Sequence, residues 1–252
     1  MDKIRIIALT ATIAIFGCAT TNKYPERALV EPKLVTSSID LEKQLAKRES
    51  VPLPDGKNWY EVIEGKSPVI ITAPHSTRPL REGKRRFSDG GGTAALAVAL
   101  GELTGATVIY TTYEGPSDPN YYDENDFKNE LARLISEKRP VFVLDIHGSH
   151  PYRSYDIDLG TMKGKSLLGN EEMLFSLIER LNSEGIHSIS YNRFGASKYE
   201  SITKFSSNKG VPAIQLEVNA IYVSPSAGNI EAQQFSKLLQ ALARFINEIV
   251  SK

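Results

Sequence analysis

The chain has 252 residues with 30 basic and 30 acidic side chains, so its formal net charge is zero. A balanced charge gives no electrostatic basis for nucleic-acid binding, because proteins that bind nucleic acids usually have an excess or a stripe of basic residues. Hydrophobic residues make up 41% of the chain, enough for a real core, and this argues against global disorder. The length is ordinary for one α/β domain.

The N-terminus, "MDKIRIIALTATIAIFGCATTNKYPE", has the pattern of a targeting segment. Lys3 and Arg5 precede a mostly apolar run that ends at Cys18, the only cysteine in the chain. This pattern predicts a signal peptide over residues 1–17 and resembles a bacterial lipobox, in which the cysteine is acylated and becomes the mature N-terminus. We therefore expect a lipid-anchored protein of the bacterial cell envelope, on the periplasmic or surface face of a membrane. A plain signal peptide and an uncleaved anchor are the alternatives.

Residues 18–57 follow the signal with several charges and the four prolines at 25, 32, 52 and 54. We interpret this stretch as a tether with one possible helix, Ser38–Arg48. Residues 58–252 are predicted to form a single catalytic domain. A lone thiol allows no disulfide within the chain, so the fold depends on its core.

After residue 57, apolar runs alternate with helical patterns. The predicted strands are Tyr60–Glu64, Val69–Ala73, Thr107–Thr112, Val141–Ile146, His187–Tyr191 and Ala213–Val218. The predicted helices are Gly92–Leu103, Asp123–Lys138, Glu171–Ser183 and Ile230–Val250, the second with Asp123 as its N-cap. Strands that alternate with helices, and that are apolar almost throughout, indicate a largely parallel sheet covered on both faces.

Polar side chains stand at the carboxyl ends of three predicted strands, where ligands bind in such sheets. His75 follows the first, "LDIHGSH" gives Asp145 and His147 after the second, and "AIQLEVN" gives Glu217 in the third. Asp89 precedes a helix between the first two. Two imidazoles and one carboxylate are a common ligand set of a catalytic zinc ion with an open water position. Such an ion lowers the pKa of water to about 7 and polarises a carbonyl.

Glu217 is the natural general base of this group. Strand periodicity places Gln215, Glu217 and Asn219 on one face, and a carboxylate inside a buried strand is costly unless it is paired or near a metal. By the same periodicity Asp145 and His147 point to one side, so we expect Asp145 to hold a ligand in place. Each residue also has an ordinary interpretation, as a turn histidine, a helix N-cap or a salt-bridge partner. The hypothesis depends on their co-occurrence at one edge of the sheet.

The ordered segments "APHST", "SDGGGT", "LDIHGS", "DIDLGT" and "IQLEVN" resemble the N-formylglutamate amidohydrolase-like family, a branch of the zinc-dependent carboxypeptidase and aspartoacylase superfamily. The resemblance implies a three-layer α/β/α sandwich around a central mixed, largely parallel sheet. It implies His75, Asp89 and His147 as ligands of one zinc ion and Glu217 as the base. It also implies that "DIDLGT" is a loop near the site, with Asp158 where asparagine is expected.

The substrate pocket matches that superfamily less well. An Asn-Arg pair commonly holds a substrate carboxylate there. The nearest candidate for substrate binding in this chain is Asn120, which is followed by Tyr121 instead of arginine. Arg193, in "YNRFGAS", is a second candidate for a bidentate carboxylate clamp, and its alternative is a surface arginine. Arg78, just after His75, is a weaker rival.

The remaining histidines and the other catalytic motifs add little. We assign His150 and His187 to structure, although His150 is close enough to His147 in sequence to compete as a ligand. The sequence has no G-x-S-x-G elbow, P-loop or dinucleotide glycine pattern, so serine-hydrolase and nucleotide chemistry have little support.

These observations predict a zinc-dependent amidohydrolase that cleaves a C–N amide bond. Its expected partners are a small N-acyl amino acid, a peptide or a related carboxylate-bearing substrate, and a membrane through the anchor on Cys18. N-formylglutamate itself fits poorly because histidine breakdown is cytoplasmic. The rival hypothesis is a lipid-anchored, non-catalytic ligand-binding protein of the cell envelope, and an esterase on the same site is a third.

Overall fold

The structure, a computed structural model, describes residues 27–252; the expected signal peptide and Cys18 lie outside the described residues. Its centre is a seven-stranded sheet in the order β1-β5-β2-β6-β9-β7-β8. The strands are β1 (Tyr60–Ile63), β2 (Val69–Ala73), β5 (Thr107–Thr111), β6 (Phe142–Ser149), β7 (Ile157–Gly160), β8 (Ile189–Tyr191) and β9 (Ala213–Asn219).

The sheet is mixed and largely parallel. The four central strands, β5, β2, β6 and β9, run parallel to one another. β1 and β7 pair antiparallel with the strands beside them, β5 and β9, and β8 is parallel to β7. A separate hairpin of β3 (Leu80–Arg81) and β4 (Lys84–Arg85) lies beyond the carboxyl end of β2. The carboxyl ends of the central strands therefore share one edge, as the sequence predicts.

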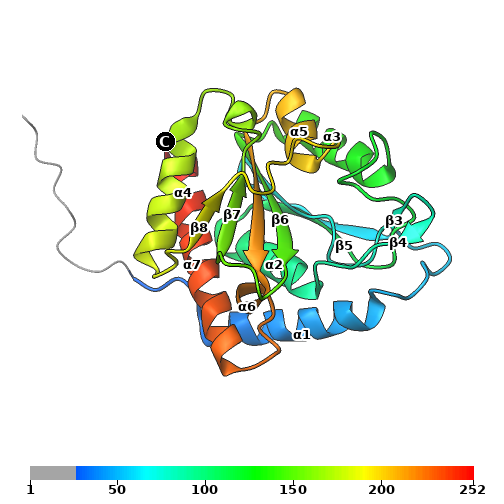
Figure 1. The fold of residues 1–252 in the computed structure, drawn as a ribbon, viewed down its shortest axis with the longest axis horizontal. Helices are drawn as coiled ribbons and strands as arrows, with labels where there is room; N and C mark the ends of the chain where they lie inside the picture. Colours follow the sequence, from blue (N-terminus) through cyan, green and yellow to red (C-terminus); the bar gives the residue numbers. More distant parts are fainter. Residues whose placement is uncertain (1–26) are drawn as a thin grey trace, which may run out of the picture.

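Helices cover both faces of the sheet, which confirms the three-layer α/β/α sandwich (Figure 1). One core joins the sheet to α2 (Gly91–Thr104), α4 (Glu171–Ser183) and α7 (Asn229–Ser251). A smaller core on the other face joins it to α3 (Asp126–Lys138) and α5 (Ile202–Asn208). The 3-10 turn η1 (Lys165–Leu167) and α6 (Ala220–Val223) are short. Within residues 27–252, no helix combines the length and apolar character needed to cross a bilayer.

The sheet face toward α3 and α5 changes character along the strands. Side chains on this face are apolar where they pack against the helices and polar near the carboxyl ends: Ile70 then Thr72 in β2, Val143 then Asp145 and His147 in β6, and Ala213 then Gln215 and Glu217 in β9. The register aligns Asp145 with Gln215 and His147 with Glu217. A polar region therefore begins where the apolar core beneath α3 and α5 ends.

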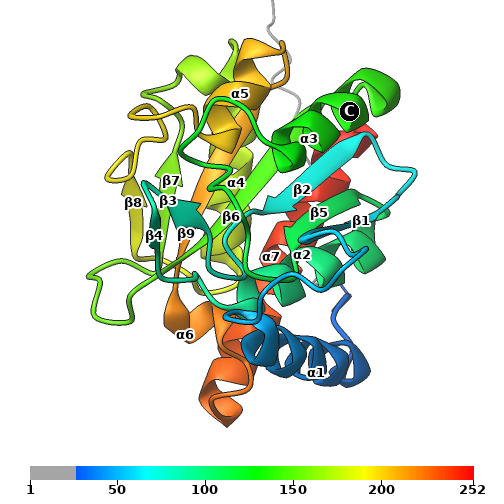
Figure 2. The ribbon, with the colours of Figure 1, turned by 90° about the vertical axis from the view of Figure 1, so that its right-hand side faces the viewer.

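The expected tether over residues 18–57 is wrong for part of its described length. α1 (Pro32–Arg48) begins six residues before the expected Ser38 and packs along α2, as Figure 2 also shows. Leu34 and Leu45 are buried in the larger core. A proline suits the first turn of a helix, because its missing N–H would have no partner there. Pro32 therefore begins a domain helix, where the sequence alone indicated a linker.

Two further local expectations are corrected. The helix expected from Asp123 begins at Asp126, because Asn125 is the N-cap and its side chain accepts a hydrogen bond from the Lys128 N–H at 3.0 Å. The "DIDLGT" segment, expected as a loop, contains strand β7, which pairs with both β9 and β8. All four residues of β7 are buried. A segment of four residues is too short for its sequence to predict this burial.

Candidate metal centre

Three side chains from distant segments converge at the carboxyl edge of the sheet. His75 follows β2, His147 lies in β6, and Asp89 stands just before α2. Asp89 Oδ2 lies 3.3 Å from His75 Nδ1 and 2.9 Å from His147 Nδ1. Both histidines are buried, and the Asp89 side chain is 7% exposed. The structure thus brings together the three residues predicted as ligands.

Glycines in the two neighbouring motifs allow this approach. A Cβ at Gly148, directly after His147, would lie 2.4 Å from the backbone oxygen of Asp89, so only glycine fits there. Gly90 has a φ of +94°, a conformation that favours glycine, and turns the chain from Asp89 into α2. The backbone N–H of Asp89 also donates to the carbonyl of His75 at 2.7 Å. These close contacts fix Asp89 beside both imidazoles.

Each histidine is held through its second ring nitrogen by another aspartate. His75 Nε2 lies 2.8 Å from Asp118 Oδ1, and His147 Nε2 lies 3.2 Å from Asp145 Oδ2. In a neutral imidazole, a carboxylate that accepts the Nε2 proton leaves the lone pair on Nδ1, the form in which histidine binds a metal. In both rings Nδ1 is the atom that faces Asp89. The expected orienting role of Asp145 agrees with this geometry.

The donor set fits a divalent cation. Ligand atoms at ~2.1 Å from a tetrahedral zinc ion stand ~3.4 Å apart. The distance from Asp89 Oδ2 to His75 Nδ1, 3.3 Å, is close to this value, and the distance to His147 Nδ1, 2.9 Å, is shorter. Burial opposes the charge of Asp89, but the neighbouring imidazoles outweigh it and lower the pKa of Asp89. Burial likewise opposes the charge of His147, but Asp145 and Asp89 raise its pKa well above the ordinary value. The Arg86 guanidinium also lies against His75 Nδ1 and 3.7 Å from Asp89 Oδ1, so one cationic side chain contacts the cluster in this structure.

Glu217 lies in the same row across the sheet. Its register partners are His147 on β6 and Asp158 on β7. Gln215, which shares its face of β9, donates from Nε2 to Glu217 Oε1 at 3.0 Å. Burial raises the pKa of Glu217 to about 7. A carboxyl group in this state can both accept and release a proton near neutral pH.

A cavity of about 300 Å³ opens over this row. The three cluster residues, Glu217, Asn120 and Arg193 all line it. The Arg193 guanidinium lies 5.8 Å from the ring centroid of Tyr155, and among the described residues it has no ion pair. Asn120 is already engaged: its Oδ1 accepts from the Ile202 N–H at 2.7 Å and its Nδ2 lies 3.2 Å from His147 Nε2. Of the two residues predicted to contact the substrate, Asn120 therefore has its side chain engaged within the protein, whereas Arg193 has no ion pair among the described residues.

Asp158 supports this cavity from outside the cluster. It lies in strand β7, and its carboxylate accepts the backbone N–H groups of Arg193 at 3.1 Å and Phe194 at 2.8 Å. The side chain thus positions the loop that carries Arg193. Asp158 is expected in a loop near the site, but the structure places it in strand β7 instead.

Three weaker candidates from the sequence, His150, His187 and Arg78, lie apart from the site. His150 and His187 are exposed, and neither belongs to the cluster that the described residues form. His187 Nδ1 instead lies 3.1 Å from Asn182 Oδ1. Arg78 Nε lies 3.6 Å from Glu49 Oε1 and does not line the cavity. Their placement agrees with the structural roles assigned to the two histidines.

Sequence reasoning missed two charged residues of the site, Asp118 and Arg86. Asp118 is fully buried, holds His75, and accepts two hydrogen bonds from Arg81 at 2.6 and 2.9 Å. Burial opposes its charge, but His75 and Arg81 outweigh this and lower the pKa of Asp118. Asp118 follows the carboxyl end of β5, so the rule that located His75 could also have located it.

The Asp118→Asn variant is expected to bind zinc about 10–100-fold more weakly than the parent, because His75 loses its charged partner while the side-chain shape is kept. Competition with a chromophoric chelator measures this. Asp123→Asn, which changes an exposed carboxylate of the same loop, is the control and should keep the parent affinity. Equal zinc affinity in the parent and in Asp118→Asn would contradict the orienting role.

Lys128 joins two loops that line the cavity. Its side chain is 1% exposed, and Nζ donates to the backbone oxygens of Tyr122 and Glu200. These loops precede α3 and α5 and carry Asn120 and Tyr199 respectively. Burial lowers the pKa of Lys128 to about 8. The ammonium group therefore connects both sides of this wall without a carboxylate partner within hydrogen-bond distance in residues 27–252.

The Lys128→Met variant should be less stable by about 2–4 kcal/mol, because both carbonyls lose a charged donor while the apolar stem is kept. Thermal unfolding followed by circular dichroism measures the change. Lys138→Met, in the same helix, removes a surface ion pair with Glu64 and should cost at most about 1 kcal/mol. Equal losses in both variants would show that Lys128 adds nothing beyond a surface charge.

The fold and the cluster together define a three-layer α/β/α protein with a buried site of two histidines and one aspartate. Three solved structures share this fold. A gene product of Agrobacterium tumefaciens has a TM-score of 0.56 and 13% identity, covering 78% of this chain and 97% of its own. The N-formylglutamate amidohydrolase of Ralstonia eutropha has a TM-score of 0.51 and 14% identity, covering 76% and 97%. The glutaminyl cyclase of an Acidobacteriales bacterium has a TM-score of 0.52 and 14% identity, covering 92% and 99%.

The resemblance inferred from the short motifs is therefore confirmed at the level of the fold. No protein-family model matches the sequence, and the comparison with curated proteins finds no match either. The fold alone does not define the function, which depends on the side chains of the site.

Proposed function

We propose that this protein is a zinc-dependent amidohydrolase that cleaves a C–N amide bond in a small, carboxylate-bearing substrate such as an N-acyl amino acid or a short peptide. His75, Asp89 and His147 would hold one zinc ion. The observation that carries the proposal is the half-buried Glu217 carboxyl group, which lines the same cavity as these three residues. A site that only binds a ligand has no need of this base.

A divalent cation in this cluster would supply a Lewis acid that polarises the scissile carbonyl and acidifies a water molecule. The carboxylate of Glu217 takes a proton from the attacking water as the C–O bond forms. It then delivers this proton to the leaving nitrogen as the C–N bond breaks, so the products are a carboxylate and an amine. Gln215 holds Glu217 Oε1 at 3.0 Å and so fixes the carboxyl group for both transfers.

Arg193 is the group that would orient the substrate. Arg193 lines the cavity, and a guanidinium can bind a carboxylate through two parallel N–H donors. A cavity of about 300 Å³ is at the small end of ligand sites, which favours a small substrate over a folded protein. One protein with this fold is, by its name, an N-formylglutamate amidohydrolase, and this supports amide chemistry.

A screen of N-acyl amino acids and short peptides, with added zinc and with a chelator, tests the proposal. We expect release of a free amine with at least one of these substrates, and loss of that activity with the chelator. Matched esters in the same screen separate amide from ester preference. If the protein never holds zinc, even after reconstitution, this result would contradict the proposal and favour the hypothesis of a non-catalytic binding protein.

We also propose the lipid anchor on Cys18, and with it a place at the bacterial cell envelope. The proposal is supported by the apolar run and the small residue Gly17 before the only cysteine. Cys18→Ser should move the protein from the membrane fraction to the soluble fraction of the producing cells. A parent protein found only in the soluble fraction would contradict the anchor.

A further inference from the structure

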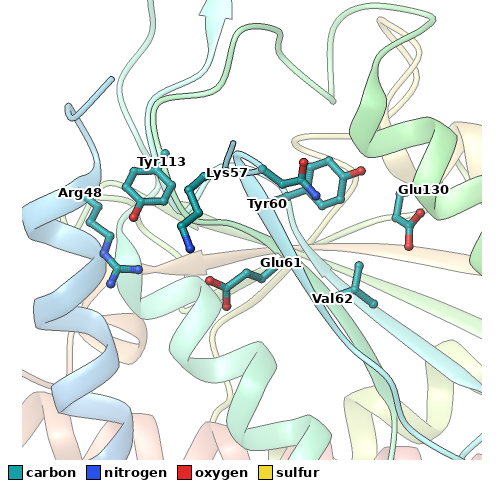
Figure 3. A pocket seen from close by; sticks show the side chains of 8 residues that line it. Arg48, Lys57, Tyr60, Glu61, Val62, Tyr113 and Glu130 are labelled. Atoms are coloured by element: carbon teal, nitrogen blue, oxygen red, sulfur yellow. The ribbon is translucent and has the colours of Figure 1, made fainter. Parts of the chain in front are cut away.

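A second and larger cavity, of about 540 Å³, lies at the free edge of strand β1. It shares no lining residue with the cavity over the metal cluster. Figure 3 shows its side chains, which come from α1, β1, α3 and the segments on either side; they include Arg48, Lys57, Tyr60, Glu61, Tyr113 and Glu130. Its volume is within the range of small-molecule sites.

Two cations of this cavity form no ion pair with any residue that the structure describes. Neither Arg48 nor Lys57 forms an ion pair within residues 27–252, and their side chains extend into the same space in Figure 3. The Arg48 guanidinium lies 5.4 Å from the ring centroid of Tyr113 and is half-buried, whereas the preceding Lys47 is exposed. Attraction to the end of α1 would act on both residues alike. The contact with Tyr113 therefore distinguishes Arg48 and holds it toward the cavity.

The two carboxylates of the cavity are engaged elsewhere. Glu61 Oε2 accepts the Tyr110 hydroxyl at 2.7 Å. Glu130 accepts two hydrogen bonds from Arg133, at 2.7 and 3.1 Å. Neither lies within ion-pair distance of Arg48 or Lys57, so the N–H donors of both cations are left without a carboxylate partner in residues 27–252, although Glu61 keeps its charge in the same cavity.

We propose that this cavity binds the oxyanion group, a carboxylate or a phosphate, of a small organic ligand. The planar guanidinium of Arg48 offers two parallel N–H donors, which match either group. The Lys57 ammonium adds a second positive charge at the same end of the cavity. This ligand is distinct from the substrate over the metal cluster, and the proposal does not depend on hydrolysis.

The second cavity is separate from the metal cluster, but one of its lining residues is hydrogen-bonded to the segment that carries His75. The backbone oxygen of Tyr113 accepts the Thr77 hydroxyl at 2.6 Å, and Thr77 is two residues beyond His75. The Thr77 N–H in turn donates to Thr111 Oγ1 at 3.1 Å. The segment that carries His75 is thus hydrogen-bonded to one wall of the second cavity.

Trp59 offers a natural reporter for binding, because it is the only tryptophan in the chain and precedes Tyr60 directly. Its ring lies 5.4 Å from the ring of Tyr60, centroid to centroid. Titration of the full-length protein with inorganic phosphate, and separately with acetate, should give a saturable change in Trp59 fluorescence. Saturation by either anion supports the site, and the stronger of the two identifies the preferred group.

Arg48→Gln should weaken this binding about tenfold or more, because a charge-assisted contact is lost. Lys47→Gln, one residue earlier on the same helix, removes an equal charge and should leave the binding within twofold of the parent. Arg193→Gln should leave the Trp59 signal unchanged, which excludes binding over the metal cluster. An unfolding temperature equal to that of the parent verifies that Arg48→Gln is folded.

The proposal is overturned if neither anion gives saturation. It is also overturned if Arg48→Gln and Lys47→Gln weaken binding equally, because the effect is then that of general surface charge. Lys57→Gln provides a second variant: a loss of binding supports the site, and parent-like binding removes Lys57 from it.

Discussion

The Glu217→Gln variant is expected to lose about 10²–10⁴-fold in kcat while it keeps one bound zinc ion per chain. The amide has the shape of the carboxylate but cannot take the proton of the attacking water. Glu217 is not one of the three clustered ligand residues, so metal binding should survive. Steady-state kinetics and metal analysis on the same preparation measure both quantities.

Glu102→Gln is the matched control, since it makes the same substitution at an exposed position on α2. Its kcat should equal that of the parent. Burial raises the pKa of Glu217 to about 7, and a bound cation lowers it from there. The ionised form is the base, so kcat of the parent should fall as the pH drops through the pKa of the loaded enzyme. Parent-like turnover in Glu217→Gln would mean that another group is the base.

The Asp89→Ala variant is expected to lose nearly all bound zinc. Asp89 is the only carboxylate of the cluster, and Oδ2 lies close to Nδ1 of both His75 and His147. Loss of a direct ligand should weaken binding by more than the roughly 10–100-fold that follows loss of an outer-shell partner. Metal analysis after reconstitution and dialysis measures the zinc content.

Stability gives a second readout for the same variant. The pKa of Asp89 is below its ordinary value in the fold, so its ionised form stabilises the metal-free protein above that ordinary pKa. This contribution is present at pH 7 and is lost as the pH falls through the lowered pKa. Ser88→Ala, at the preceding position, should leave zinc binding intact. An Asp89→Ala protein that still retains one zinc ion would remove Asp89 from the ligand set.

Strand periodicity was enough to predict much of the site. His75, His147 and Glu217 follow from two local rules, that side chains alternate along a strand and that parallel strands end at one edge. The same rules paired Asp145 with His147. These contacts are set within single strands and by the order of neighbouring strands, so a sequence can indicate them.

Contacts between distant segments could not be predicted in this way. Lys128 binds the backbone oxygen of Glu200, 72 residues away, and Asp118 meets His75 across 43 residues. α1 is amphipathic, but only its packing on α2 shows that it belongs to the domain. β7 is too short for a periodic signal, and its place beside β9 depends on the whole sheet.

The convergence of Asp89 with two imidazoles from separate segments has a thermodynamic consequence. An ion that binds only the folded chain shifts the folding equilibrium by mass action, by about 4 kcal/mol when its free concentration is 1,000 times its dissociation constant. The cluster joins the ends of β2 and β6 to the start of α2, which are far apart in an unfolded chain. Occupancy of the site and cooperativity of unfolding are thus linked, and the melting temperature should rise with the concentration of free zinc.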